Sequence, residues 1–301
     1  MARNRSMFRH TSTLLHSFTP PLLHSYNNML VYTFDGTLDG LLSAVFDAYF
    51  RRQQPEMLMA EGEQLPLFCE EVYQVPTIDE KARRVWAGLE KRLKSDVLKL
   101  IATSWLSEEK DLATPLFRYI YKVFQSDSTK AKARQTPVPS GGVGGGYNFA
   151  DPDVLYVTNT ARRVMHEQLR MKQFIRFQKA KDGTYLGVVS PDNNVLPLII
   201  NHFRDRFGDQ SWLIYDAKRH YGYYYADGES PIRVTFENEA EVPFDLSNGK
   251  LNDDVLSTDD QLFQELWRTY FKAICIRERI NPKKQLSDMP RRYWKYMTEK
   301  Q

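Results

Sequence analysis

Five side chains of this sequence are candidates for acid–base chemistry. They are Asp35, Asp39, His202, Asp205 and Asp216. Two carboxylates, such as Asp35 and Asp39, can divide the roles of general acid and general base, and histidine titrates near neutral pH. His202 and Asp205 are three residues apart, which places them on one edge of a helix. Each candidate has a structural alternative, because aspartates also cap turns and helices, and His202 with Asp205 could form a helix-end ion pair.

The cysteine content argues against a resident metal or cofactor. Cys69 and Cys275 are the two cysteines of the sequence and are far apart. Two thiols cannot supply a four-cysteine zinc site, a three-cysteine iron–sulfur cluster or a disulfide framework. His166 and Glu167 lack the second histidine of a zinc-protease helix. We therefore expect no metal site and no cofactor, in a protein of the reducing cytoplasm.

Positive side chains gather in two distant segments, residues 162–181 and residues 277–301. The first contains seven Lys or Arg and one acid, and the second contains eight Lys or Arg and three acids. Both also contain aromatic residues, and guanidinium groups bind phosphates while aromatic rings stack on unpaired bases. We predict a nucleic-acid surface on which the two segments converge. The candidate phosphate ligands are Arg162, Arg163, Arg170, Arg176, Arg206, Arg219, Lys283, Lys284, Arg291 and Arg292.

The alternative for these basic segments is structural. A charge run is usually a solvated face, and the aromatic residues between the cations could belong to the core. For the C-terminal segment we expect both roles, with Trp294 packed against the protein and some of the cations facing a ligand. The overall net charge of +3 does not by itself identify a nucleic-acid-binding protein.

The bulk composition indicates a globular protein. Hydrophobic residues make up 42% and charged residues 26% of the 301 residues. The longest uninterrupted apolar run, residues 195–200, is far shorter than the roughly 20 residues of a membrane-spanning helix.

The first half of the chain is predicted to be mainly helical. Residues 1–28 are basic and interrupted by two prolines, and we interpret them as a disordered or non-native N-terminal extension. Residues 29–125 start with a strand and continue into a helix that begins near Thr37. Residues 53–74 are rich in Gln, Glu and Pro, which predicts a surface excursion. Three further helices are predicted after this segment. Residues 126–150 are rich in Gly, Ser and Pro and predict a linker.

Residues 151–301 are predicted to form an α+β region. A helix is followed by a hairpin centred on Asp182 and Gly183, an amphipathic helix, a second strand pair and a further strand. The order β-β-α-β-β favours an antiparallel sheet with one helix packed on a face. An apolar C-terminal helix and the basic-aromatic tail complete the chain. The fold class predicted for the whole protein is α+β.

Five motifs together resemble a bacterial family known as probable DNA metabolism proteins. They are YTFDGTLDGLLSAVFDAY, HEQLRMKQFIRFQK, VLPLIINHFRDRF, WLIYDAKR and RINPKKQLSDMPRRYWKYMTE. The resemblance runs from about Met29 to the C-terminus, with the motifs in the expected order. It implies a partnership with a radical S-adenosylmethionine protein in DNA repair or modification, and the iron–sulfur cysteines would belong to that partner. Some relatives carry a uracil-DNA glycosylase-like domain, which we do not expect here because nothing follows Gln301.

Three hypotheses about function follow. The leading one is a DNA-binding accessory factor that acts with the radical S-adenosylmethionine partner. The second is a DNA-processing enzyme, a nuclease or lyase, that uses the candidate aspartates or His202. The third is a protein–protein adaptor without nucleic-acid binding, whose basic surface meets an acidic patch on its partner.

Overall fold

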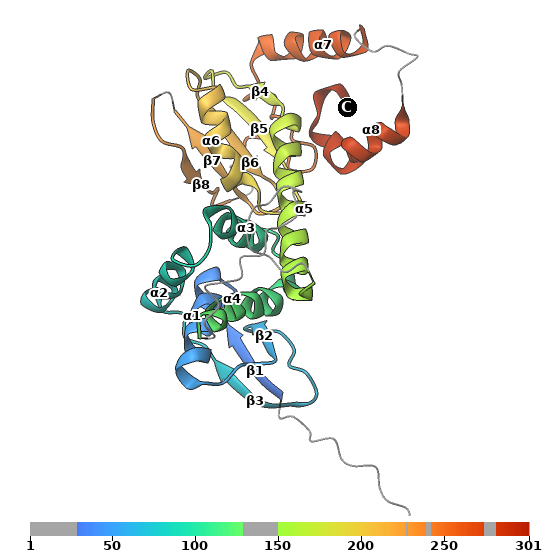
Figure 1. Ribbon diagram of the computed structural model, residues 1–301. Helices are drawn as coiled ribbons and strands as arrows, with labels where there is room; N and C mark the ends of the chain where they lie inside the picture. Colours follow the sequence, from blue (N-terminus) through green and yellow to red (C-terminus); the bar gives the residue numbers. More distant parts are fainter. Residues whose placement is uncertain (1–28, 129–149, 227, 239–241, 274–280, 301) are drawn as a thin grey trace, which may run out of the picture.

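The computed structural model of the chain describes residues 29–128, 150–226, 228–238, 242–273 and 281–300 (Figure 1). The predictions for residues 1–28 and for most of the 126–150 linker lie outside these described residues. The described chain forms two lobes that share one long helix. As expected from the element pattern, the fold class is α+β.

The N-terminal lobe contains a parallel three-stranded sheet with the strand order β2-β1-β3. The strands are β1 (Met29–Phe34), β2 (Met57–Ala60) and β3 (Cys69–Gln74), and α1 (Leu38–Arg51) follows β1. Residues 53–74 are mostly exposed, as predicted for a surface excursion, but the prediction missed that both outer strands come from this segment. The reason is that β3 is an edge strand with mostly exposed side chains, so its polar sequence hid its pairing with β1.

Helices cover this sheet and build the first core. They are α2 (Asp79–Glu90), α3 (Ser95–Trp105), the short η1 (Lys110–Leu112) and α4 (Ala113–Ser128). Their fully buried residues include Leu89, Leu100 and Phe117, which pack in one cluster with Tyr32 and Phe34 of β1. This part of the chain is mainly helical, as its sequence predicts.

The C-terminal lobe contains a mixed five-stranded sheet with the order β4-β5-β6-β7-β8. Its strands are β4 (Phe177–Lys179), β5 (Tyr185–Val189), β6 (Trp212–Asp216), β7 (Tyr221–Tyr225) and β8 (Ile232–Val234). The β4–β5 and β6–β7 hairpins are antiparallel, but β5 and β6 are parallel. The prediction of an antiparallel sheet was wrong at this pair. The helix between them, α6 (Leu196–Arg206), returns the chain to the end of the sheet at which β5 began.

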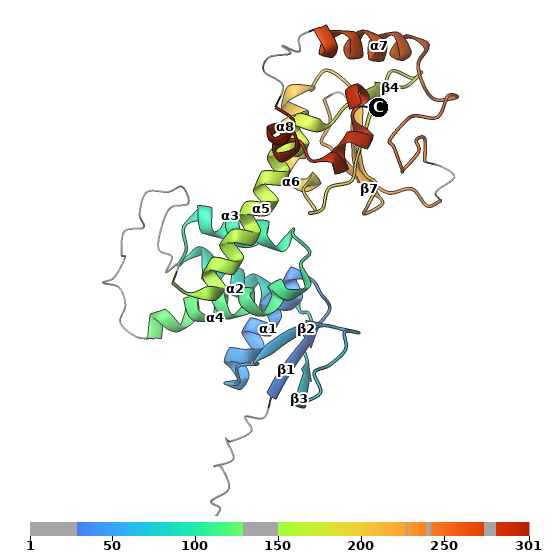
Figure 2. The same ribbon diagram turned by 90° about the vertical axis from the view of Figure 1, so that its right-hand side faces the viewer.

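The long helix α5 (Pro152–Phe174) connects the two lobes (Figure 2). Val157 and Ala161 of its first half belong to the N-terminal core, whereas Met171 and Phe174 of its second half belong to the C-terminal core. Because one continuous helix is buried in both cores, the lobes are held in one relative orientation.

The C-terminal segment contains α7 (Thr258–Ala273), α8 (Pro282–Asp288), η4 (Arg291–Tyr296) and η5 (Thr298–Lys300). η4 folds back onto the lobe and buries Tyr293 and Tyr296. α7 lies at the outer edge of the molecule in both views (Figures 1 and 2). Within the described residues, none of the helices has the length and apolarity needed to traverse a lipid bilayer.

Candidate nucleic-acid interface

The two basic segments meet in space. Arg170 of α5 donates a hydrogen bond to the backbone carbonyl of Ser287 in α8, at 3.0 Å. The rings of Phe174 and Tyr293 lie 5.7 Å apart, and the ring of Tyr293 is buried. The sequence prediction that these segments converge therefore agrees with the contacts between α5, α8 and η4.

Many of the converging cations are neutralised by acids. Arg176 forms a two-pronged ion pair with Glu299, with a shortest distance of 2.6 Å. The side chain of Glu299 is only 1% exposed. Burial by itself would raise the pKa of Glu299, but the hydrogen bonds from Arg176 and Trp267 help to hold that pKa below its ordinary value. Through this ion pair with Glu299, Arg176 holds η5 against the lobe.

Glu167 of α5 plays the same role for η4. Its buried carboxylate accepts a hydrogen bond from the hydroxyl of Tyr293 and forms an ion pair with Arg292 at 3.3 Å. It also accepts hydrogen bonds from the backbone N–H groups of Asp192 and Asn193. Burial would raise the pKa of Glu167, but these hydrogen bonds outweigh it and hold the pKa below its ordinary value. Arg292 also contacts the carboxylate of Asp192 at 2.8 Å.

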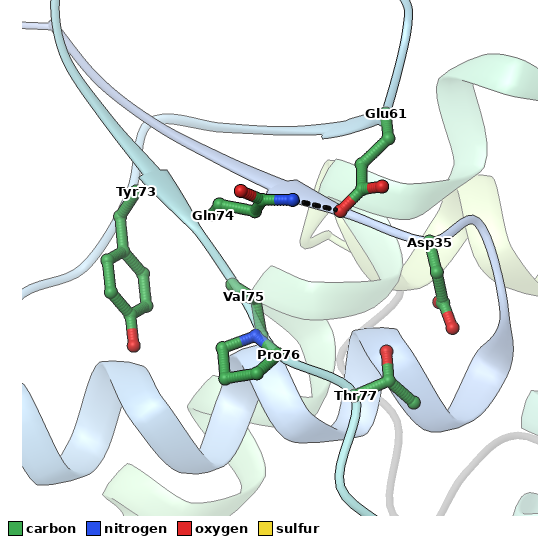
Figure 3. Close-up of a pocket in the computed structure, with 7 residues that line it drawn as sticks. All are labelled: Asp35, Glu61, Tyr73, Gln74, Val75, Pro76 and Thr77. Carbon is green, nitrogen blue, oxygen red and sulfur yellow. Dashed lines mark hydrogen bonds between the residues drawn. The ribbon is translucent and has the colours of Figure 1, made fainter.

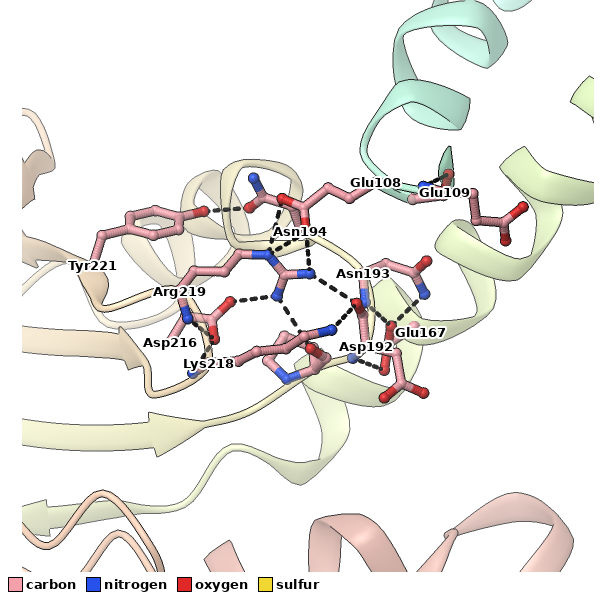
Figure 4. A network of polar contacts seen from close by, with 12 residues as sticks. Glu108, Glu109, Glu167, Asp192, Asn193, Asn194, Asp216, Lys218, Arg219 and Tyr221 are labelled. Atoms are coloured by element: carbon pink, nitrogen blue, oxygen red, sulfur yellow. Dashed lines mark hydrogen bonds and ion pairs between the residues drawn. The ribbon is translucent and has the colours of Figure 1, made fainter. Parts of the chain in front are cut away.

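Arg219 is the centre of a polar network at the joint between the lobes (Figure 4). Its guanidinium group bonds to the carboxylate of Asp216 at 2.8 Å and to that of Glu108 at 2.7 Å. It also donates to the backbone carbonyls of Pro191 and Asp192. Because Glu108 follows α3 and Asp216 ends β6, this cation ties the N-terminal lobe to the carboxyl end of the β5–β6 pair.

Asp216 is fully buried beneath Arg219. Burial raises the pKa of this carboxyl group, and its hydrogen bonds from Arg219 and from the backbone N–H of Lys218 oppose the increase. A buried carboxylate enclosed by an arginine and backbone N–H groups stabilises the turn between β6 and β7. Asp216 is therefore brought together with Arg219, but not with His202 or Asp35.

The ten candidate cations divide into two groups. Those paired with an acid are Arg163, Arg176, Arg219, Lys284 and Arg292. Those without an ion pair to any described residue are Arg162, Arg170, Arg206, Lys283 and Arg291. These five cations are available to bind a phosphate, because no described acid forms an ion pair with them.

The aromatic residues of the tail point inward, whereas Arg291 is exposed. Tyr293 and Tyr296 are buried, and the indole N–H of Trp294 donates to the backbone carbonyl of Met289 at 3.0 Å. Trp294 packs against the C-terminal core, as expected for a structural residue. Arg291 is exposed, with its guanidinium carbon 5.8 Å from the centre of the Trp294 ring.

Asp35 is part of a turn at the start of α1. Its carboxylate accepts hydrogen bonds from the backbone N–H and the hydroxyl of Thr37, and the Thr37 hydroxyl accepts one from Gly40. Burial alone would raise the pKa of Asp35, but these and further hydrogen bonds lower it. Asp39 is exposed in the first turn of the helix, where an acid is favoured by the helix dipole. Both aspartates therefore have complete structural explanations.

Asp35 also borders an open cleft of about 430 Å³ (Figure 3). Tyr73, Gln74 and Thr77 line it from β3 and the segment after it, and Glu61 lines it from the residue after β2. A second cavity of about 220 Å³ lies beside Phe34 and Trp105. Both lie where the parallel strands of the N-terminal sheet end, the position at which ligands of parallel sheets commonly bind.

His202 and Asp205 share the edge of α6 but do not bond to each other. Asp205 accepts from Arg204 at 2.9 Å. Burial lowers the pKa of His202, and the neighbouring cations Lys172 and Arg206 lower it further. The described residues contain no group of three or more His, Cys, Asp and Glu side chains able to hold a metal ion.

Sequence reasoning missed the acids that organise this region. Glu108, Glu109 and Asp192 were not considered, and Glu167 was considered only as the one acid of residues 162–181 and as part of a zinc-protease pattern. One local signal does exist at Glu108, whose backbone adopts a left-handed conformation with φ of 56°. This conformation is seen only in the structure, because a glutamate in the sequence does not indicate a left-handed backbone.

Comparison with known proteins gives one family. A family model described as "Domain of unknown function (DUF4130)" matches residues 142–299, slightly more than half of the chain. No curated protein and no solved structure matches this chain. The matched region contains Glu167, Asp216 and Arg219 of the polar contacts, residues 162–181, residues 277–299 of the second basic segment, and α7.

Proposed function

This chain belongs to the DUF4130 family, whose description carries no function, and we propose from its geometry that it is a DNA-binding accessory factor in DNA metabolism. In this proposal the chain holds DNA by its phosphates, and a radical S-adenosylmethionine partner carries out the repair or modification chemistry. The partner class rests on the resemblance of the five sequence motifs.

The observation that carries the proposal is the contact between α5 and the C-terminal segment. Arg170 reaches the carbonyl of Ser287, and Lys283 lies one helical turn before Ser287 on the exposed surface of α8. Arg291 follows α8 and is also exposed. Three cations without an acidic partner among the described residues therefore come from both basic segments, next to the contact between α5 and α8. This arrangement supports binding of a phosphate backbone.

The test is DNA binding by fluorescence anisotropy at several salt concentrations, with single-stranded and double-stranded oligonucleotides. The double variant Lys283→Gln/Arg291→Gln is expected to weaken binding of both. For duplex DNA the slope of log K against log salt should fall by about 2, since each lost phosphate contact contributes about 0.9. The melting temperature should not change, because neither side chain pairs with an acid among the described residues.

A matched control removes the same charge from the other lobe. Arg84 and Lys99 are exposed on α2 and α3 and have no ion pair among the described residues, so Arg84→Gln/Lys99→Gln should leave the affinity and the salt slope close to wild type. Equal weakening by the two double variants would show that only net charge matters. Wild-type protein that does not bind DNA even at low salt would refute the proposal.

The adaptor hypothesis remains the second candidate, because half of the predicted phosphate ligands are committed to ion pairs with acids. It predicts a complex with the radical S-adenosylmethionine protein that forms without DNA. Formation of this complex, together with the absence of DNA binding by either component of the pair alone, would favour the adaptor.

A further inference from the structure

α7 carries a stripe of large apolar side chains that are open to solvent. The exposed fractions are 58% for Leu262, 63% for Phe263, 54% for Leu266, 39% for Trp267 and 54% for Tyr270. Their spacing of one, three and four residues places them on one face of the helix. A contiguous apolar face of this kind marks an interaction surface on a folded protein.

The described side chains of α7 that contact its own lobe do so through polar groups instead. The carboxylate of Asp260 accepts a hydrogen bond from the backbone N–H of Lys179 at 2.9 Å. Arg268 donates to the backbone carbonyl of Thr298 at 3.3 Å, and the indole N–H of Trp267 donates to Glu299 at 3.1 Å. A surface helix normally buries its apolar side and exposes its polar side. In α7 only Trp267, at one edge of the apolar stripe, contacts the described lobe among the five stripe residues, through Glu299 and through the guanidinium group of Arg176. Leu262, Phe263, Leu266 and Tyr270 remain more than half exposed.

The described part of the chain leaves the outer side of α7 uncovered. In two views at right angles, α7 lies at the same edge of the molecule, and no other labelled element lies beyond it (Figures 1 and 2). The apolar stripe is therefore available to a second molecule.

We propose that a second copy of this chain covers the stripe, with the two α7 helices packed antiparallel about a two-fold axis at Leu266. Leu262 and Tyr270 are each four residues from Leu266, so an antiparallel pair places Leu262 against Tyr270 of the partner subunit. Leu266 then meets its own counterpart on the axis. The stripe is self-complementary in this arrangement, as a two-fold interface requires.

The position of the charges favours the antiparallel pair. Asp259 lies one turn before Phe263 in line with the stripe, and a parallel pair would place it against its own counterpart. Glu265 and Arg268 lie off the stripe by helical spacing, and Arg268 is turned toward Thr298. The centre of the stripe is thus free of charge, which is characteristic of interfaces between identical subunits.

The available area is close to what a small dimer needs. An aromatic side chain buries about 150–250 Å² when fully covered, so three aromatic residues and two leucines that are about half exposed offer roughly 500 Å² per subunit. Stable interfaces begin near about 600 Å² per subunit, and the flanks of the helices supply the remainder. The inference depends on α7 alone and is independent of the proposed role in DNA metabolism.

The experiment measures the mass of the full chain in solution by sedimentation velocity, over about a hundredfold range of concentration. Wild-type protein should form a dimer, and Leu266→Glu should weaken the dimer by about 100-fold or more, because two buried charges would meet on the axis. Leu169→Glu is the matched control, since Leu169 is 55% exposed on α5 and lies outside the interface. It should leave the dimer unchanged.

Cysteine trapping tests the geometry separately. In a chain with Cys69 and Cys275 changed to serine, Leu266→Cys should give a disulfide-linked dimer on mild oxidation, because the two positions meet on the axis. Leu262→Cys should not link to itself, but should link to Tyr270→Cys in a mixture. A monomer at all concentrations, a dimer that resists Leu266→Glu, or linkage of Leu262→Cys to itself would each overturn the proposal.

Discussion

At the scale of single residues, the role of a cationic side chain depends on whether it forms an ion pair with a buried acid. Arg176, Arg219 and Arg292 each contact a buried or nearly buried carboxylate, so they hold the fold together. Lys283 and Arg291 have no such partner in the described part of the chain and remain available to a ligand. Breaking a buried pair costs about 3–5 kcal/mol, whereas removing an exposed unpaired charge costs little.

Glu167 yields a prediction about acid stability. Its pKa is lower in the folded protein than its ordinary value of 4.5, so its ionised form stabilises the fold above that pH. This contribution is lost as the pH falls through the lower folded pKa. Glu167→Gln should therefore reduce the free energy of unfolding at pH 7 by about 1–3 kcal/mol and flatten the loss of stability below pH 4.5.

Urea denaturation at a series of pH values between neutral and strongly acidic would check this. The control is Asp209→Asn, which removes the same charge at an exposed position and should keep the wild-type midpoint at pH 7. If Glu167→Gln kept the full acid dependence of the wild type, Glu167 would not be the group responsible.

At the scale of elements, the C-terminal turns depend on contacts with the rest of the lobe. η4 and η5 are short 3₁₀ helices, which have little stability of their own. They are held by the burial of Tyr293 and Met297 and by the ion pair between Arg176 and Glu299. The tail is thus an anchored element, although its composition resembles a solvated basic terminus.

Arg176→Gln should release this anchor. The variant leaves the carboxylate of Glu299 buried without its charge partner, at a cost of about 3–5 kcal/mol. Hydrogen exchange measured by mass spectrometry should then show faster exchange in residues 293–300, with β5 and β6 unchanged. Arg206→Gln is the control, because Arg206 is exposed and has no ion pair in the described residues. Unchanged protection of the tail in Arg176→Gln would contradict this role.

At the scale of the whole molecule, α5 makes the two lobes unfold together. Its first half contributes to one core and its second half to the other, with the change between Ala161 and Val164. The contact between Glu108 and Arg219 adds a second connection. We therefore expect a single cooperative unfolding transition for the wild-type chain.

His166→Pro should separate this transition into two. His166 is exposed, and proline at this position removes the hydrogen bond to the carbonyl four residues earlier, at the place where the cores change. The local cost is about 3 kcal/mol or more. Differential scanning calorimetry would resolve the two transitions, and His166→Ala, which keeps the helix, should retain one. A single transition in His166→Pro would mean that other contacts couple the lobes.

Local patterns determined much of the element order. The hairpin at Asp182–Gly183 was predicted because an Asp-Gly pair suits a turn with positive φ, and Gly183 has a φ of 89°. The helix with Leu196, Ile199 and Phe203 was predicted from its apolar spacing. The inward position of Trp294 also followed from its type and surroundings. These features depend on neighbours in the chain, so the sequence contains their signal.

The remaining features were decided by tertiary contacts. β5 and β6 are parallel because α6 crosses between them, and residue periodicity does not encode that direction. Whether a cation is free depends on an acid elsewhere in the chain: Arg219 meets Glu108 and Arg176 meets Glu299, both more than 100 residues away. The sequence by itself determined where positive charge is concentrated along the chain, whereas only the fold decided which charges remain unneutralised, because ion pairing depends on distance in space.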